Sequence, residues 1–207
     1  RRRQTSPSDL TLKRDAPACS DSAGPSPMRK SRCALTRAAA AARHNRTAMS
    51  ASSYAHLEPL RAALQREGLA GGLRFLNARV PHRYTAAYRV QQDTLVNLDL
   101  VDKAGELRPE FLASVPLQDS FCQFVLRDGG FGTECSAQDP RLDGHRYQGV
   151  MGAYHGVPLV DDDGGLFGTL CHFDTDERTL PDEEFAFLQK AARLMSAVVT
   201  RQLPRPR

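Results

Sequence analysis

Cysteine, histidine and acidic side chains that could do chemistry gather in the second half of the chain. Cys122, Cys135, Cys171, His155 and His172 supply thiol and imidazole groups, which are common ligands of metals and haem. No two of them have the spacing of a ligand motif. A strand running through Cys171 and His172 would point these two side chains to opposite faces of its sheet. We therefore expect no metal or haem site.

The acidic groups of the same region also have structural interpretations. Asp161, Asp162 and Asp163 offer carboxylate oxygens to a hard cation, but the spaced ligands and distal glutamate of a calcium loop are missing, so we interpret them as a solvated turn. Asp139-Pro-Arg141 is interpreted as a local ion pair that shapes its loop. No nucleophile has a base at motif spacing, and no phosphate-binding glycine loop occurs. We predict that the chain is not an enzyme.

Two apolar runs around these aspartates indicate a β-hairpin. Residues 153–160 and 166–173 are rich in apolar and aromatic side chains, and residues 161–165 supply aspartates and glycines suited to a tight turn. Further upstream, residues 84–90 are strand-like and Val96, Leu98 and Leu100 alternate with polar residues, which predicts an antiparallel pair. Residues 131–137 are expected to form another strand.

Helical patterns flank these strands. Leucines at helical spacing predict a helix from about Tyr54 that Gly68 interrupts, and a second helical piece runs toward Pro81. A short helix is expected near residues 118–127, ended by residues 128–130 as a glycine cap. The last helix starts at about Pro181, where acidic residues suit the helix dipole.

The last helix carries two apolar stripes. One comprises Phe185, Leu188, Ala192, Met195 and Val199, and the other Phe187, Ala191, Leu194 and Val198. If one stripe packs on the sheet, the other is available to a second copy, so we predict a homodimer through terminal helices. A single broad stripe facing the core is the alternative.

The order of short motifs along the chain resembles the GAF family of small sensory domains, of the stand-alone bacterial type. The series is Ser120-Phe-Cys, Asp139-Pro-Arg141, Gly156-Val-Pro-Leu159, Phe167-Gly-Thr-Leu-Cys171 and a terminal amphipathic helix, within about seventy per cent of the chain, residues 57–200. The resemblance implies an α+β fold with an antiparallel sheet of five or six strands. The N- and C-terminal helices would cover one face, and the short helix and loops would enclose a ligand pocket on the other.

Carried over from the family, the residues expected to line this pocket come from the short helix, the following loop and the strands. They are Phe121, Cys122, Val125, Asp139, Arg141, Tyr154, Thr169, Cys171 and Phe173. The signature that GAF domains use for cyclic nucleotides has no match. Cys171-His172 falls in a strand rather than in a helix near a chromophore, which argues against a bilin. The cysteine pattern differs from that of GAF-fold free methionine sulfoxide reductases, so that activity is not inferred.

The net charge of +4 divides unevenly along the chain. Residues 1–48 hold 11 bases and 3 acids, and the remainder holds 17 bases and 21 acids, so nucleic-acid binding is not expected of the domain. Residues 1–48 lack Phe and Tyr and contain four prolines, which predicts a disordered leader, and we expect it to be foreign to the native protein. Residues 49–203 form the predicted domain, and 204–207 a tail. The chain has no apolar run of the roughly 20 residues that a membrane span needs. Its three domain cysteines are widely spaced, which argues against a disulfide framework. We therefore expect a cytoplasmic protein with no membrane partner.

The first hypothesis is a non-catalytic sensory domain that binds a small apolar or amphipathic molecule and signals through its terminal helices to a separate kinase or cyclase. The second is a dimeric scaffold whose pocket is vestigial. The third is a redox sensor or reductase using Cys122 or Cys171. The sequence leaves the ligand unidentified.

Overall fold

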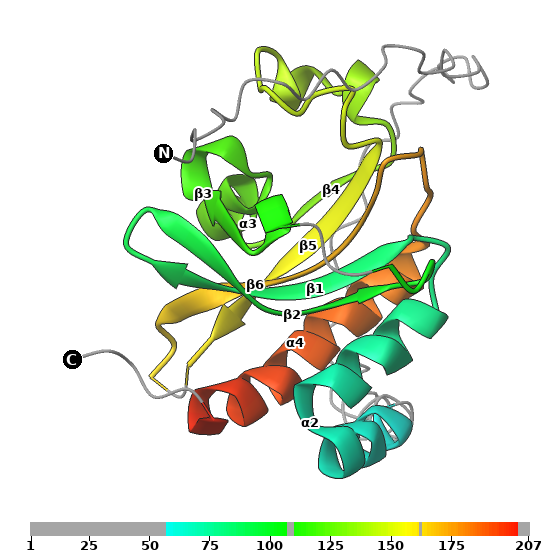
Figure 1. Ribbon diagram of the computed structural model, residues 1–207, viewed down its shortest axis with the longest axis vertical. Helices are drawn as coiled ribbons and strands as arrows, with labels where there is room; N and C mark the ends of the chain where they lie inside the picture. The colour runs from blue at the N-terminus through cyan, green and yellow to red at the C-terminus, as the bar shows by residue number, and fades with distance from the viewer. Residues whose placement is uncertain (1–56, 107–109, 162, 203–207) are drawn as a thin grey trace, which may run out of the picture. The chain divides into compact units, whose positions relative to one another are not determined.

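In a computed structural model, described for residues 57–106, 110–161 and 163–202, the chain forms a six-stranded antiparallel sheet (Figure 1). The strands are β1 (Tyr84–Gln91), β2 (Thr94–Asp102), β3 (Ser114–Pro116), β4 (Phe131–Thr133), β5 (Ala153–Val160) and β6 (Leu166–Asp174). Their order is β3-β2-β1-β6-β5-β4, and every neighbouring pair is antiparallel. Both predicted hairpins, β1–β2 and β5–β6, are confirmed.

Two long helices cover one face of this sheet (Figure 1). They are α2 (Glu58–Ala78) and α4 (Asp182–Gln202). Leucines of α2 and the apolar side chains of α4 pack with Ala87, Val157 and Leu170 of the sheet into a first core. Removal of this apolar surface from water is the main force that holds the helices on the sheet.

The break predicted at Gly68 is confirmed. Gly68 has φ 60° and ψ −148°, so α2 consists of two helical pieces that meet at this residue. A Cβ at Gly71 would lie 2.6 Å from the backbone oxygen of Ala63, and one at Gly72 would lie 2.5 Å from the Leu64 side chain. Glycine at 71 and 72 therefore allows the two pieces to approach closely.

A short helix and loops cover the other face. Helix α3 (Cys122–Asp128) ends at Gly129 in the left-handed conformation, as the glycine cap predicted. Single-turn 3-10 helices occupy Glu110–Leu112, Leu117–Asp119, Ser136–Gln138 and Pro140–Leu142. Together with the sheet they enclose a second core rich in aromatic side chains. This arrangement confirms the predicted α+β class and its two layers of covering elements.

Both stripes of α4 face inward over most of their length, and Leu194 and Val198 of the second stripe are only half-buried. Phe187 and Ala191 of the second stripe are buried, like Leu188 and Met195 of the first. The ring of Phe187 lies 6.4 Å from that of Phe75 on α2. The burial matches the alternative of one broad stripe facing the core, and the homodimer stays a prediction.

Strand β4 is shorter than the predicted segment 131–137. It ends at Thr133. The Ser136 hydroxyl then donates a hydrogen bond to the carbonyl oxygen of Met151 and accepts one from the Gly149 N–H. These bonds draw the chain into a 3-10 turn beside the loop before β5, so the strand cannot continue. The predicted leader 1–48 and tail 204–207 lie outside the described residues. Among the residues that the structure describes, none of the helices combines the length and apolar character that a membrane span requires.

Candidate functional site

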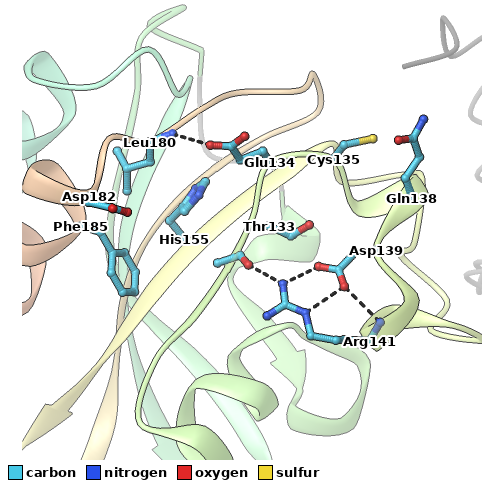
Figure 2. Close-up of a pocket in the computed structure, with 11 residues that line it drawn as sticks. Thr133, Glu134, Cys135, Gln138, Asp139, Arg141, His155, Leu180, Asp182 and Phe185 are labelled. Atoms are coloured by element: carbon cyan, nitrogen blue, oxygen red, sulfur yellow. Dashed lines mark hydrogen bonds and ion pairs between the residues drawn. The ribbon is translucent and has the colours of Figure 1, made fainter. Parts of the chain in front are cut away.

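A groove of about 560 Å³ opens where β4, β5, the loop after β4 and the start of α4 meet. Figure 2 shows Asp139 and Arg141 on its loop side and Asp182 and Phe185 on its α4 side, with Thr133 and His155 between them. The remaining lining residues are Gly132, Glu134, Cys135, Gln138 and Leu180. A volume of this size suits a small molecule.

Asp139 and Arg141 form a two-pronged ion pair on the loop side (Figure 2). Arg141 Nε lies 2.9 Å from Asp139 Oδ1, and Nη2 lies 2.6 Å from Oδ2 and 2.6 Å from the Gly132 carbonyl oxygen. The guanidinium holds the pKa of Asp139 at about 2. The guanidinium also lies over the Phe131 ring, 4.6 Å from its centroid. The pair shapes the loop against β4, as the sequence interpretation had it.

The α4 side is partly apolar and otherwise acidic. Leu180 and the half-buried Phe185 supply the apolar surface. Glu134 accepts a hydrogen bond from the Leu180 N–H at 3.4 Å, which ties the loop to the entry of α4. Asp182 stands exposed in the first turn of α4. Because Arg141 already neutralises Asp139, the groove keeps an excess of negative charge.

His155 connects the groove to a buried cluster of three histidines. Its Nδ1 lies 3.1 Å from Nε2 of His82, and the His82 ring lies 5.8 Å from that of His172. Thr85 Oγ1 lies 2.7 Å from His172 Nδ1 and accepts a hydrogen bond from the Asn77 amide. Nδ1 of His82 is buried without a hydrogen-bond partner.

Burial keeps these imidazoles neutral. It lowers the pKa of His82 to about 4, where Asp174 opposes the shift, and that of His155 to about 3, where His82 adds to it. The pKa of His172 falls well below its usual value for the same reason, and both other histidines add to the effect. Neutral imidazole suits a low-dielectric interior, in which an imidazolium is poorly solvated.

The structure divides the nine residues predicted to contact a ligand. Asp139 and Arg141 lie at the groove. The other seven are nearly inaccessible to solvent. Six of them belong to the second core: Phe121, Cys122, Val125, Tyr154, Cys171 and Phe173. The seventh, Thr169, contacts this core by donating a hydrogen bond to Cys122. A binding role stays a prediction for all nine.

Alternation along β6 separates the thiols from the imidazoles. Cys171 joins Cys122 in the second core, and His172 joins His82 and His155 on the opposite side of the sheet. Within the described ranges, no three His, Cys, Asp or Glu residues are placed to hold a metal ion. Cys122 and Cys171 are free thiols, but Cys135 is disulfide-bonded, which departs from the expectation of unpaired domain cysteines.

Sequence reasoning missed much of the groove and the centre of the histidine cluster. Nothing around His82 forms a motif, because its partners come from distant strands. Phe185 was recognised only as an apolar position of the last helix. Its place beside β4 depends on where that helix starts relative to the loop, and sequence spacing does not report this.

No family model matches the sequence, and no curated protein matches it. Solved structures do. A free methionine-R-sulfoxide reductase from Neisseria meningitidis, in complex with its substrate, is 18% identical with a TM-score of 0.57, over 74% of this chain and 93% of that one. A GAF domain from an Acinetobacter phosphoenolpyruvate-protein phosphotransferase is 15% identical with a TM-score of 0.56, over 71% and 94%. The domain has the GAF fold.

A third match corrects one prediction about this GAF-fold domain. The type II free methionine-R-sulfoxide reductase from Thermoplasma acidophilum is 18% identical, with a TM-score of 0.52, over 70% of this chain and 96% of that one. Two of the three structures named here are therefore enzymes. These matches contradict the prediction, drawn from missing catalytic motifs, that the chain is not an enzyme, because proteins of the same fold are enzymes. At this identity the likeness establishes the fold alone.

Proposed function

We propose that this GAF-fold domain is a regulatory module that binds a small amphipathic molecule in the groove beside β4. The observation that carries the proposal is the groove itself, with about 560 Å³ of space and a lining that is apolar on one side and polar on the other. Ligand sites typically combine apolar surface with a few polar groups that fix orientation. The second core leaves less space for a ligand, because its side chains are packed against one another.

The charges of the groove favour a ligand with a cationic or donor-rich end. Within the described residues, neither Glu134 nor Asp182 forms an ion pair with an arginine, whereas Asp139 is held by Arg141. An ammonium group could lie near Asp182 while an apolar body contacts Phe185 and Leu180. Electrostatic attraction would then select the ligand by charge, and the apolar contact would supply most of the affinity.

Helix α4 is the element through which we propose that the bound state is passed on. Phe185 belongs both to the groove and to the first turns of α4, so a ligand there contacts the helix directly. Leu194 and Val198, further along α4, are only half-buried and leave apolar surface for a second copy. We propose a homodimer in the cytoplasm that signals to a separate kinase or cyclase.

Two small probes of similar size and opposite charge test the groove. Phenethylamine carries an aromatic ring and an ammonium group, and phenylacetate carries the same ring and a carboxylate. Calorimetric titration of the full chain should give tighter binding of phenethylamine. Asp182→Asn should weaken that binding by about fivefold, which corresponds to about 1 kcal/mol for a partly exposed ion pair.

A neighbouring residue provides the matched control. Glu183 is exposed in the same turn of α4 but does not line the groove, so Glu183→Gln should leave the affinity unchanged. Phe185→Ala should weaken the binding of both probes, because it removes apolar contact rather than charge. Equal binding of the two probes, or binding that neither Asp182→Asn nor Phe185→Ala changes, would contradict the proposal.

A further inference from the structure

Two free thiols from distant parts of the chain meet inside the second core. Cys122 is the first residue of α3 and is 2% exposed, and Cys171 lies in the middle of β6 and is fully buried. Thr169, which lies two residues before Cys171 on the same face of β6, donates a hydrogen bond to Cys122 Sγ, so Cys122 lies over this part of the strand. Cys171 also lies 3.7 Å from the carbonyl oxygen of Ala86 on β1. Two free thiols that share one core in this way are candidates for a disulfide.

Cys122 is surrounded by hydroxyl donors. Tyr154 Oη and Thr169 Oγ1 each donate to its Sγ from 3.2 Å. Donation from Cys171 contributes most to lowering the pKa of Cys122, to about 6; burial opposes the shift, and Ser120, Thr169 and Tyr154 add to it. The pKa of Cys171 is raised well above its usual value through the same contact and burial. The pair thus consists of one thiol that ionises readily and one that keeps its proton.

A glycine on β5 makes room for the phenol. A Cβ at Gly156 would lie 2.4 Å from Oη of Tyr154, so no larger residue fits while Tyr154 reaches Cys122. Gly156 pairs with Cys171 in the β5–β6 ladder, which places this space beside the second thiol. A cysteine that only fills space in a core needs no such arrangement of donors.

We propose that Cys122 and Cys171 are a redox-active pair that a hydroperoxide converts into an intramolecular disulfide. This inference does not rest on the proposed ligand groove, which lies between other residues. It differs from sensing by a single exposed thiol, because the second thiol resolves the first oxidation product.

The reaction proceeds in two balanced steps. The Cys122 thiolate attacks one peroxide oxygen, the O–O bond breaks, and the leaving oxygen takes a proton and departs as water or, from an alkyl hydroperoxide, as an alcohol. Cys122 is then a sulfenic acid. The Cys171 sulfur attacks the Cys122 sulfur, the S–O bond breaks, and the hydroxide takes the Cys171 proton and leaves as water. Two thiols lose two electrons, and one peroxide gains them.

The oxidant reaches the pair by local opening of α3. This helix has only seven residues and is followed by Gly129 in the left-handed conformation. Short elements of this kind open more readily than the central strands of a sheet. Oxidation should therefore be slower than that of an exposed thiolate, and denaturation is not required.

Peptide mapping of the full chain tests the proposal directly. After treatment with hydrogen peroxide, alkylation and tryptic digestion, residues 104–127 should be recovered joined to residues 147–178, because these peptides contain Cys122 and Cys171, and Cys135 falls in 128–141. Dithiothreitol should separate them. Recovery of both peptides in the alkylated thiol form, or as separate sulfinic acids, would overturn the proposal.

Variants that remove a hydroxyl without changing shape test the donors. Tyr154→Phe and Thr169→Val should each slow the formation of the joined peptide at pH 5, where a rise of one unit in the pKa of Cys122, from about 6, lowers its thiolate fraction about tenfold. Tyr84→Phe is the matched control, since Tyr84 stacks on Phe173 in the same core and is not one of the hydroxyl donors to Cys122. Cys171→Ser keeps a donor beside Cys122 but cannot form the disulfide, so it should leave a sulfenic acid at Cys122 that dimedone labels. Equal rates in Tyr154→Phe, Thr169→Val and Tyr84→Phe, or no dimedone adduct in Cys171→Ser, would refute the mechanism.

Discussion

The buried histidine cluster predicts that the domain loses stability in mild acid. His82, His155 and His172 are 0%, 6% and 2% exposed and contact one another across β5, β6 and the segment before β1. All three have a folded-state pKa below the usual value of 6.5. As the pH falls, these histidines therefore bind protons at a higher pH in the unfolded chain than in the folded chain. Stability is complete above pH 6.5 and falls as the pH drops toward the folded pKa values.

The size of the loss follows from the pKa values. With an unfolded pKa of 6.5 and folded values of about 4 for His82 and about 3 for His155, each histidine removes at most about 2 kcal/mol of unfolding free energy between pH 7 and pH 5. His172 acts in the same direction. The two contributions are not independent, because His82 itself lowers the pKa of His155. Their sum is a large part of the roughly 5–15 kcal/mol of a typical domain.

Urea unfolding followed by far-ultraviolet circular dichroism, repeated from pH 5 to pH 7.5, measures this dependence. His82→Gln should reduce the loss between pH 7 and pH 5 by up to about 2 kcal/mol, whatever it does to stability at neutral pH. His145→Gln is the matched control: His145 is half-buried outside the cluster, so its replacement should remove a smaller part. An unchanged pH dependence in His82→Gln would refute the reasoning, because His82 would then titrate alike in both states.

Two further predictions concern the sheet and the assembly. A Cβ at Gly168 would lie 1.9 Å from the backbone oxygen of Tyr88, so Gly168→Ala should lower the free energy of unfolding, measured with urea, by roughly 3 kcal/mol. Gly105→Ala should cost less, because no atom lies within 4 Å there and only the left-handed φ of 70° opposes a side chain; equal costs would contradict this account. Light scattering of the full chain at high concentration should give the mass of a dimer, and Leu194→Glu should shift it to that of a monomer; a monomeric mass for the unaltered chain would remove the basis of the predicted homodimer.

The elements could be predicted well because each is specified by residues near one another in sequence. The tight turn between 153–160 and 166–173 pairs two apolar runs, and Gly68 breaks a leucine-spaced helix with a conformation that glycine adopts freely. The motif order then indicated how the elements are arranged. Strand β4 was predicted too long because its end depends on Ser136 bonding a loop fifteen residues away.

The candidate site was predicted less well because it depends on how the covering elements fill space. Phe121, Tyr154 and Phe173 are of the types that line pockets, but the same aromatic types also fill cores. In this domain, Phe121 packs edge-on against Tyr154, and Phe173 stacks on Tyr84. Side-chain type alone does not distinguish a lined cavity from a filled one.

Strand alternation predicts one feature of the site from the sequence, namely which side chains share a face of the sheet. Alternation predicts Cys171 and His172 on opposite faces of the sheet, and it applies equally to Tyr154 and His155 on the neighbouring strand. Because β5 and β6 pair Tyr154 with Phe173 and His155 with His172, polar imidazoles collect on one side and the phenol and thiol on the other. Alternation could not supply Cys122, which comes from a helix 49 residues before Cys171. Oxidation of the thiol pair therefore depends on contacts made only in the packed structure and on access through α3, which the rate of disulfide formation measures directly.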